Sequence, residues 1–254
     1  FYLLHIYIRF VLQKTLYMKK LFFSLIVMAF FISCNYRESV RGNGNVTTES
    51  RSVSSFKDIR LSGSMNVHLI KGAAYSVEIK GEENILPYIE TNVADDKLII
   101  KYTDGVNINT RRDATVTVTL PKLQEVDITG SGDITGETKF TGNDEIELGV
   151  TGSGNMKLEV DAPAIEAKIT GSGDIYLSGN TKNIKCSTKR KKKIEATELK
   201  AENAVVKTLG SGSINVFASI KLDATVNGSG DITYKGGASV NSKINGSGSV
   251  KAVD

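Results

Sequence analysis

The residues with the clearest capacity for chemistry are acids that follow a recurring Gly-Ser-Gly: Asp133, Asp174 and Asp231. The order Gly-x-Gly-x-Asp also occurs in repeats that hold Ca²⁺ in a β-roll, where the motif returns about every nine residues. Here successive copies lie 18 to 22 residues apart. The same position in the other three copies is neutral: Asn155, Ser213 and Ser249. We therefore favour a turn-forming role and predict no metal site and no cofactor, with a Ca-binding β-roll-like protein as an alternative.

A run of five cations takes the place of one Gly-Ser-Gly-Asp copy. It consists of Lys189, Arg190, Lys191, Lys192 and Lys193. Such a run can bind anionic lipid headgroups or acidic polysaccharide. It can equally be a turn that has drifted in sequence and is simply solvated. Both interpretations stay open, and the run is a candidate anion-binding patch.

The segment before residue 35 carries a targeting signal. Met18-Lys19-Lys20 precedes an apolar run from Leu21 to Ile32 and then Ser33-Cys34, which resembles the lipobox of bacterial lipoproteins, with Phe31 where leucine is usual. The apolar run is short for a membrane-spanning helix. We predict a signal peptide over 18–33, lipidation of Cys34, and export to the outer membrane with the lipid as anchor. Residues 1–17 are expected to be an upstream non-native extension, and 34–54 a polar tether.

The charge balance argues against a general affinity for nucleic acid. The chain has 32 basic and 28 acidic residues. Four of the basic residues, Arg9, Lys14, Lys19 and Lys20, precede Cys34, and no acid does. The part from Cys34 onward is therefore formally neutral, and nucleic acid is not expected as a partner.

The spacing of the glycine corners predicts a solenoid. Each corner follows an apolar triplet with a period of two residues, such as Ile146, Leu148 and Val150. Period two indicates strands, and a unit this short fits one coil of a parallel β-helix. Glycine suits a tight corner between stacked coils, where a Cβ has no room. The expected corner residues are Gly130, Gly132, Asp133, Gly152, Gly154, Asn155, Gly171, Gly173, Asp174, Gly210, Gly212, Gly228, Gly230, Asp231, Gly246 and Gly248.

The coil that lacks its glycines can be located from the same spacing of the apolar triplet relative to the corner. Ile184, Cys186 and Thr188 occupy the triplet positions and Ile194 follows the basic run. Cys186 is therefore expected to be a buried, unreactive residue. We predict an all-β chain with an irregular β region over 55–122 and a regular parallel β-solenoid of 18–22-residue coils over 123–254.

Several motifs together resemble one known family. They are Ile59-Arg60-Leu61-Ser62-Gly63-Ser64, Asn84-Ile85-Leu86-Pro87-Tyr88-Ile89, Leu120-Pro121-Lys122-Leu123 and the repeated Gly-Ser-Gly-Asp. This order is similar to the putative auto-transporter adhesin, head GIN domain family, over about residues 50–250. The resemblance implies a short exported protein with a right-handed, pectate-lyase-like β-helix and no catalytic residues to transfer.

No arrangement of residues indicates an enzyme. His68 is the one histidine after Cys34, and no triad, metal cluster or phosphate loop is visible. The segments between strands are short, so no deep cleft is expected. We predict a non-catalytic structural or interaction module, adhesin-like, with surface glycans or envelope proteins as partners and end-to-end self-association through the last coil. The alternative is a polysaccharide-active β-helix enzyme.

Overall fold

The computed structural model describes residues 38–189 and 192–253, and the chain from Ser39 onward is one compact unit. Cys34 and the expected signal peptide lie outside the described residues. The elements are β1 (Glu38–Arg41), β2 (Val46–Arg51), β3 (Asp58–Gly63), β4 (Asn66–Lys71), β5 (Ser76–Glu82), the 3₁₀ turn η1 (Leu86–Tyr88), β6 (Ile89–Ala94), β7 (Lys97–Tyr102), β8 (Val106–Asn109), β9 (Thr115–Leu120), β10 (Glu125–Gly130), β11 (Ile134–Gly136), β12 (Glu145–Val150), β13 (Met156–Ile169), β14 (Ile175–Lys189), β15 (Lys193–Gly210), β16 (Ser213–Phe217), β17 (Lys221–Gly228), β18 (Asp231–Lys235), β19 (Ser239–Asn245) and β20 (Ser249–Ala252).

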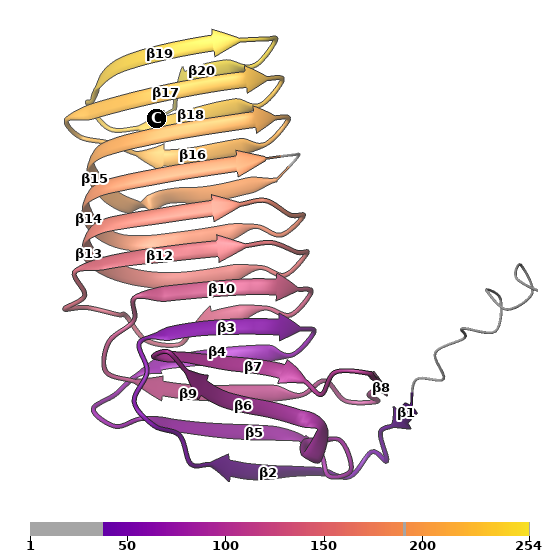
Figure 1. Cartoon of the computed structure of the whole chain (residues 1–254). Coiled ribbons are helices and arrows are strands. Elements are labelled where there is room, and N and C mark those ends of the chain that lie inside the picture. The colour runs from indigo at the N-terminus through magenta and orange to yellow at the C-terminus, as the bar shows by residue number, and fades with distance from the viewer. Residues whose placement is uncertain (1–37, 190–191, 254) are drawn as a thin grey trace, which may run out of the picture. The chain divides into compact units, whose positions relative to one another are not determined.

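Most of these strands stack in parallel as the coils of a β-solenoid, which confirms the predicted fold class (Figure 1). One face runs through β3, β10, β12, β13, β14, β15, β17 and β19. The other runs through β4, β11, β13, β14, β15, β16, β18 and β20. The long strands β13, β14 and β15 contribute to both faces. The faces meet at the glycine corners on one side and at a bend near Pro163 on the other.

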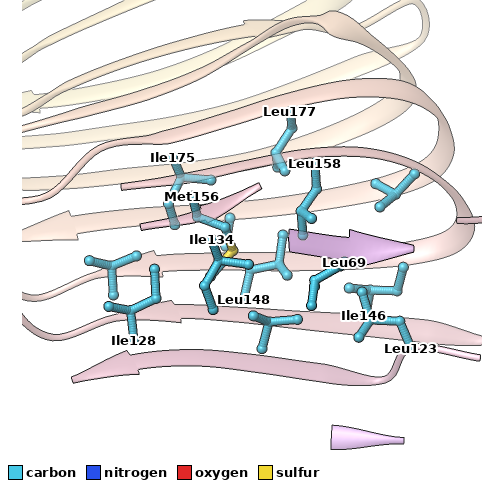
Figure 2. Packing of buried hydrophobic residues seen from close by; sticks show 14 of the residues in the cluster. Leu69, Leu123, Ile128, Ile134, Ile146, Leu148, Met156, Leu158, Ile175 and Leu177 are labelled. Carbon is cyan, nitrogen blue, oxygen red and sulfur yellow. The ribbon is translucent and has the colours of Figure 1, made fainter. Parts of the chain in front are cut away.

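The interior is a ladder of aliphatic side chains, one from each coil. Ile134 pairs in register with Met156, and Met156 with Ile175 (Figure 2). The ladder continues in the same way through Ile194, Ile214, Ile232 and Val250. Burial of each such side chain contributes about 1.5–3 kcal/mol. Period-two apolar positions therefore build one continuous core, with no disulfide among the described residues.

The coil without glycines occupies its predicted place. Ala167 pairs with Cys186 and Cys186 with Val206, so Cys186 lies in the inward column as predicted. It is 1% exposed, and burial raises the pKa of its thiol to about 12. This thiol is therefore unreactive. The next coil is one residue longer because the register of β14 and β15 shifts between Tyr176 and Ser178.

The N-terminal end of the solenoid is closed by antiparallel strands. β3 and β4 form a coil directly beneath β10 and β11, and β7 and β9 lie beneath that coil. β6 then pairs antiparallel with β7, and β5 with β9. Residues 58–71 thus belong to the solenoid, although their corner has only Gly63 of the repeated glycines.

The polar segment expected to be a tether is partly folded, which corrects the expectation. β2 pairs antiparallel with β5 although its side chains are almost all exposed. Backbone hydrogen bonds and Glu82 hold it instead of an apolar face. Glu82 is 1% exposed and accepts N–H groups from Gly44 at 2.5 Å and Arg111 at 2.8 Å. Burial opposes its ionisation, but these backbone donors outweigh burial and lower the pKa of Glu82.

Candidate functional site

The glycine corners are held by backbone atoms of neighbouring coils. Ser153 N and Gly154 N both donate to the carbonyl oxygen of Gly130, at 2.7 and 3.2 Å. Ser172 N and Gly173 N donate in the same way to Gly152 O. A Cβ on either glycine of a corner would overlap a carbonyl oxygen one coil below, as the positions of Gly132, Gly152, Gly154, Gly171, Gly173, Gly228, Gly230, Gly246 and Gly248 show. The close stacking of backbones therefore accounts for Gly-Ser-Gly.

The acids that follow the glycines also have backbone partners. Asp133 Oδ1 accepts from Asn155 N at 2.7 Å, and Asn155 Oδ1 accepts from Asp174 N at 3.1 Å. Asp231 Oδ1 accepts from Ser249 N at 3.0 Å. Each side chain thus bridges to the next coil. Within the described residues, no group of three or more His, Cys, Asp or Glu side chains could hold a metal ion.

The basic run is only partly described, because Arg190 and Lys191 lie outside the described residues. Lys189 ends β14 and is exposed. Lys193 lies at the start of β15, and its Nζ is 2.5 Å from Glu195 Oε2. The hydrogen bond to Glu195 raises the pKa of Lys193 and outweighs the opposing effect of burial. Lys193 is therefore a paired cation, which weakens the case for the run as an anion site.

An open groove lies at the bends of the coils, opposite the glycine corners. It has a volume of about 640 Å³ and is lined by residues 142–143, 161–163, 180–182, 200–202, 217 and 219. We call it the bend groove. The bend groove is open to solvent, which agrees with the expectation that the short segments between strands build no deep cleft. The groove arises because small, buried side chains stack at its floor: Ala162 against Thr181, and Thr181 against Ala201.

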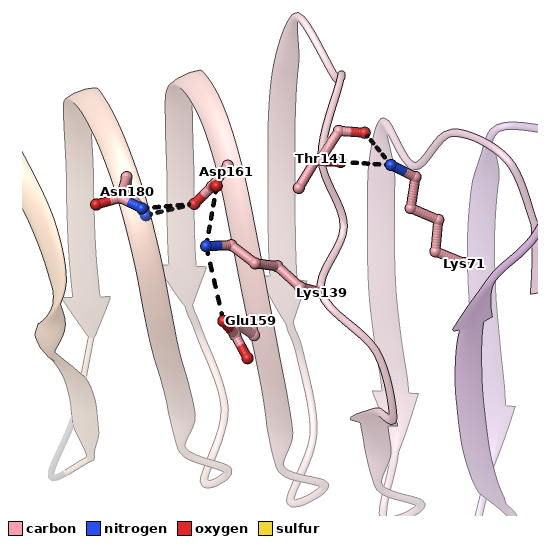
Figure 3. Close-up of polar contacts among 6 residues, drawn as sticks. All are labelled: Lys71, Lys139, Thr141, Glu159, Asp161 and Asn180. Atoms are coloured by element: carbon pink, nitrogen blue, oxygen red, sulfur yellow. Dashed lines mark hydrogen bonds and ion pairs between the residues drawn. The ribbon is translucent and has the colours of Figure 1, made fainter.

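At one end of the bend groove, Asp161 is held by charged and amide partners (Figure 3). Lys139 Nζ lies 2.9 Å from Asp161 Oδ2 and 3.7 Å from Glu159. Asn180 donates to Asp161 Oδ1 through both its backbone N, at 2.8 Å, and its Nδ2, at 3.0 Å. Partial burial would raise the pKa of Asp161, but the hydrogen bonds from Lys139 and Asn180 outweigh it and lower this pKa. Asp161 is therefore a fixed anion at neutral pH.

At the other end, an aromatic ring is half-exposed beside a cation. Lys200 Nζ lies 4.4 Å from the centroid of the Phe217 ring, within the range of a cation–π contact. Across the groove, Asn143 is 6% exposed, and its Oδ1 accepts from Leu123 N at 3.0 Å. The Asn143 Nδ2 has no hydrogen-bond partner among the described residues. The groove thus combines an anion, cations and a partly buried aromatic ring.

A second, smaller hollow of about 260 Å³ lies on the face that contains β10, β12 and β13. Glu125 is 2.6 Å from Lys97 Nζ, and Asp127 is 3.0 Å from Arg60 Nη2. Burial and the hydrogen bond to Glu125 raise the pKa of Asp127. Glu147 and Glu166 stack beside them in register. Lys97 and Arg60 already neutralise Glu125 and Asp127. This hollow is therefore an ion-paired part of the sheet surface.

His68 lies on β4, away from both hollows. Its Nδ1 contacts Glu137 at the surface, and neither residue lines the bend groove.

Among the described residues, no helix has the length and apolarity to cross a membrane.

The groove residues could not be recognised from the glycine repeat, because they lie at the bends on the opposite side of each coil. The sequence does contain a pattern that indicates the groove. Long polar residues recur at one position of successive coils: Asp161, Asn180 and Lys200. Each is followed directly by a small residue: Ala162, Thr181 and Ala201. A column of long polar residues beside a column of small ones indicates a hollow. The contributions of Asn143 and Phe217 depend on how the neighbouring loops close, which the period does not show.

Solved structures share this fold. A putative adhesin from Bacteroides fragilis matches with a TM-score of 0.78 and 24% identity, over 84% of this chain and 100% of that chain. A putative lipid binding protein from Parabacteroides distasonis and a putative adhesin from Parabacteroides merdae match with TM-scores of 0.74 and 0.71. Both are 26% identical, over 85% of this chain and 100% of theirs.

Curated proteins gave no significant match. A family model described as putative auto-transporter adhesin, head GIN domain, matches residues 55–238. This span contains β3 to β18, the glycine corners as far as Gly230 and the whole of the bend groove. The chain belongs to the head GIN domain family of putative auto-transporter adhesins.

Proposed function

We propose that the protein is a non-catalytic, adhesin-like binding module of the cell envelope. The observation that carries this proposal is that the acids best placed for chemistry already form ion pairs or hydrogen bonds within the protein. Asp161 is fixed by Lys139 and Asn180, and Asp133 and Asp231 accept backbone N–H groups. A general acid needs a pKa near the working pH, whereas that of Asp161 is lowered. What the structure offers instead is a rigid, preformed groove, which suits binding.

The relatives support the same proposal. Two solved structures of 26% identity bear the names putative lipid binding protein and putative adhesin. For this chain, the mix of charges in the bend groove suits a polar ligand better than an acyl chain, because an unpaired charge beside hydrocarbon is costly. We therefore favour adhesion to an envelope or surface component as its role.

The anchor is part of the proposal. Cys34 would carry the lipid and hold the folded unit at the outer membrane, with about 0.8 kcal/mol contributed by each buried methylene. Its test is metabolic labelling with an alkyne fatty acid in a Bacteroides host, followed by fractionation of membranes. The wild-type chain is expected to be labelled and membrane-bound. The Cys34→Ala variant is expected to be unlabelled and released, and labelling of that variant would contradict the anchor.

The last coil supports self-association as a second property. Val240 and Ile244 on β19 occupy the inward phase of Leu222 and Val226 but are 38% and 45% exposed. An unpaired strand edge with apolar residues is a site for further pairing. Sedimentation over a wide concentration range tests this, and a strict monomer would contradict it. The double variant Val240→Lys/Ile244→Lys is expected to reduce any association.

Binding and catalysis are separated by one experiment on the purified protein. Immobilised envelope polysaccharides are incubated with it, and both retained protein and newly formed reducing ends are measured. Retention with no reducing ends is the expected result. Reducing ends that increase with time, and that disappear in a Glu202→Gln variant, would instead establish a polysaccharide-active enzyme with Glu202 of the bend groove as a catalytic acid.

A further inference from the structure

The charges that line the bend groove cancel. Lys182 and Lys200 supply two cations, and Asp161 and Glu202 supply two anions. Asp161 has in addition its partner Lys139, outside the lining. A surface built for an anionic chain would show an excess of cations. The balance therefore favours a ligand without net charge.

The polar groups of the groove can both donate and accept. Lys182 is exposed at the groove and can donate. Glu202 is exposed at the groove and can accept. Hydroxyl groups match such a mixture, because each one donates and accepts.

The remaining lining suits a ring with apolar C–H faces. Phe217 is half-exposed in the groove, and Ala162, Thr181 and Ala201 form a flat floor of small side chains. Neighbouring coils are about 4.8 Å apart, so a groove that crosses the coils from Asp161 to Phe217 is elongated along the solenoid. A chain of rings fits this shape better than a single compact ligand.

An extended peptide is less suitable for this place. Peptides that add to sheets use an unpaired strand edge, whereas β14 is paired on both sides at the groove. Next to it, Asp161 N donates to Phe140 O, and Ser219 N donates to Ala201 O. Main-chain groups of the groove floor are already used by neighbouring coils. Recognition there must come from side chains.

We propose that the bend groove binds a neutral, hydroxyl-rich glycan chain that lies along the solenoid axis. One ring would lie against Phe217, and hydroxyls would pair with the exposed side chains of Lys182 and Glu202. This inference rests on the proposed binding function and names the class of ligand and its site.

The test is binding of the full chain to an array of neutral and acidic bacterial and plant oligosaccharides, followed by affinity measurement on the neutral glycans retained. Two substitutions change the groove, Phe217→Leu and Glu202→Gln. Two controls make corresponding changes at exposed residues outside it: Tyr176→Leu on β14, which also replaces an aromatic ring by leucine, and Glu198→Gln on β15. Each groove variant is expected to weaken binding about tenfold, the equivalent of one lost interaction. The controls are expected to bind like the wild type.

Three outcomes would overturn the inference. They are retention of acidic glycans alone, neutral-glycan binding that the groove variants leave unchanged, and no glycan binding by a protein that is still retained on isolated envelopes. In each of these the proposed binding function survives. Absence of retention on both glycans and envelopes would contradict the proposed function as well. Far-ultraviolet circular dichroism of all four variants identifies any that fail to fold. If one groove variant does not fold, the glycan affinity of the other groove variant decides whether the inference holds.

Discussion

Asp133 Oδ1 accepts a hydrogen bond from the backbone N of Asn155, the residue in the same position one coil further on, at 2.7 Å. The same relation joins Asp174 Oδ1 to Lys193 N at 3.0 Å, although the basic run has replaced the glycines of that coil. The acid of the repeated motif thus serves the neighbouring backbone. Asn155 accepts in the same way from Asp174 N, which explains why asparagine also occurs at this position.

Removal of such an acceptor is expected to destabilise the fold. Asp174→Ala leaves Lys193 N without its partner, and a lost hydrogen bond of this kind costs about 1 kcal/mol. Asp174→Asn retains an acceptor oxygen and is expected to unfold close to the wild-type midpoint. Urea unfolding followed by circular dichroism measures both. Equal destabilisation by the two substitutions would show that the charge, and not the acceptor, is what matters.

Calcium is expected to have no effect on stability. In the folded chain, Oδ1 of each of Asp133, Asp174 and Asp231 accepts a hydrogen bond from a backbone N of the next coil. A ligand that binds the folded state raises the apparent stability. Thermal unfolding in about 5 mM CaCl₂ and in EDTA should therefore give the same Tm for the folded chain. A Tm that rises with calcium would support the β-roll-like alternative.

The second glycine of a corner is expected to tolerate no side chain. In Gly173→Ala the new Cβ would overlap the carbonyl oxygen of Gly154. Forcing extra atoms into a close-packed contact costs about 1–3 kcal/mol. Gly237→Ala is the matched control, because a Cβ there meets nothing within 4 Å. A Gly173→Ala protein as stable as Gly237→Ala would contradict the account of the corners.

Acid is expected to weaken the fold. The pKa values of Glu82, Asp161 and Glu195 are lowered from their usual 4.5, 3.8 and 4.5 by hydrogen bonds that outweigh burial. The unfolded chain therefore binds these protons more readily, so this stability is present above about pH 4.5 and is lost as the pH falls through the lowered values. Asp58 and Asp127 have raised pKa values and act in the opposite sense.

Urea midpoints at about pH 6 and about pH 3 measure the balance of these groups. The midpoint is expected to be lower at the acidic pH. In Glu82→Gln the difference between the two midpoints should shrink, because that group no longer titrates. A midpoint that rises on acidification would mean that Asp58 and Asp127 dominate.

The regular half of the fold could be predicted because residues one repeat apart in the sequence stack on one another in successive coils. Ile134, Met156 and Ile175 share a phase in the sequence and a column in the structure. The same phase located Cys186 in a coil without glycines. β2 could not be predicted, since Glu82 and backbone hydrogen bonds hold it and its own residues are polar. The bend groove was missed because it depends on side-chain size at the bends and on Asn143 and Phe217 from loops that break the period.

The central claim is that the bend groove is the surface by which the protein binds the envelope. Ser219 is exposed within the groove, and Ser172 is exposed at a glycine corner on the opposite side. Beads that carry the wild-type chain, Ser219→Trp or Ser172→Trp are incubated with isolated cell envelopes, and the retained fraction is measured. We expect Ser219→Trp to lose most of the retention, because its ring fills the groove, and Ser172→Trp to keep it. Full retention of Ser219→Trp would contradict the claim.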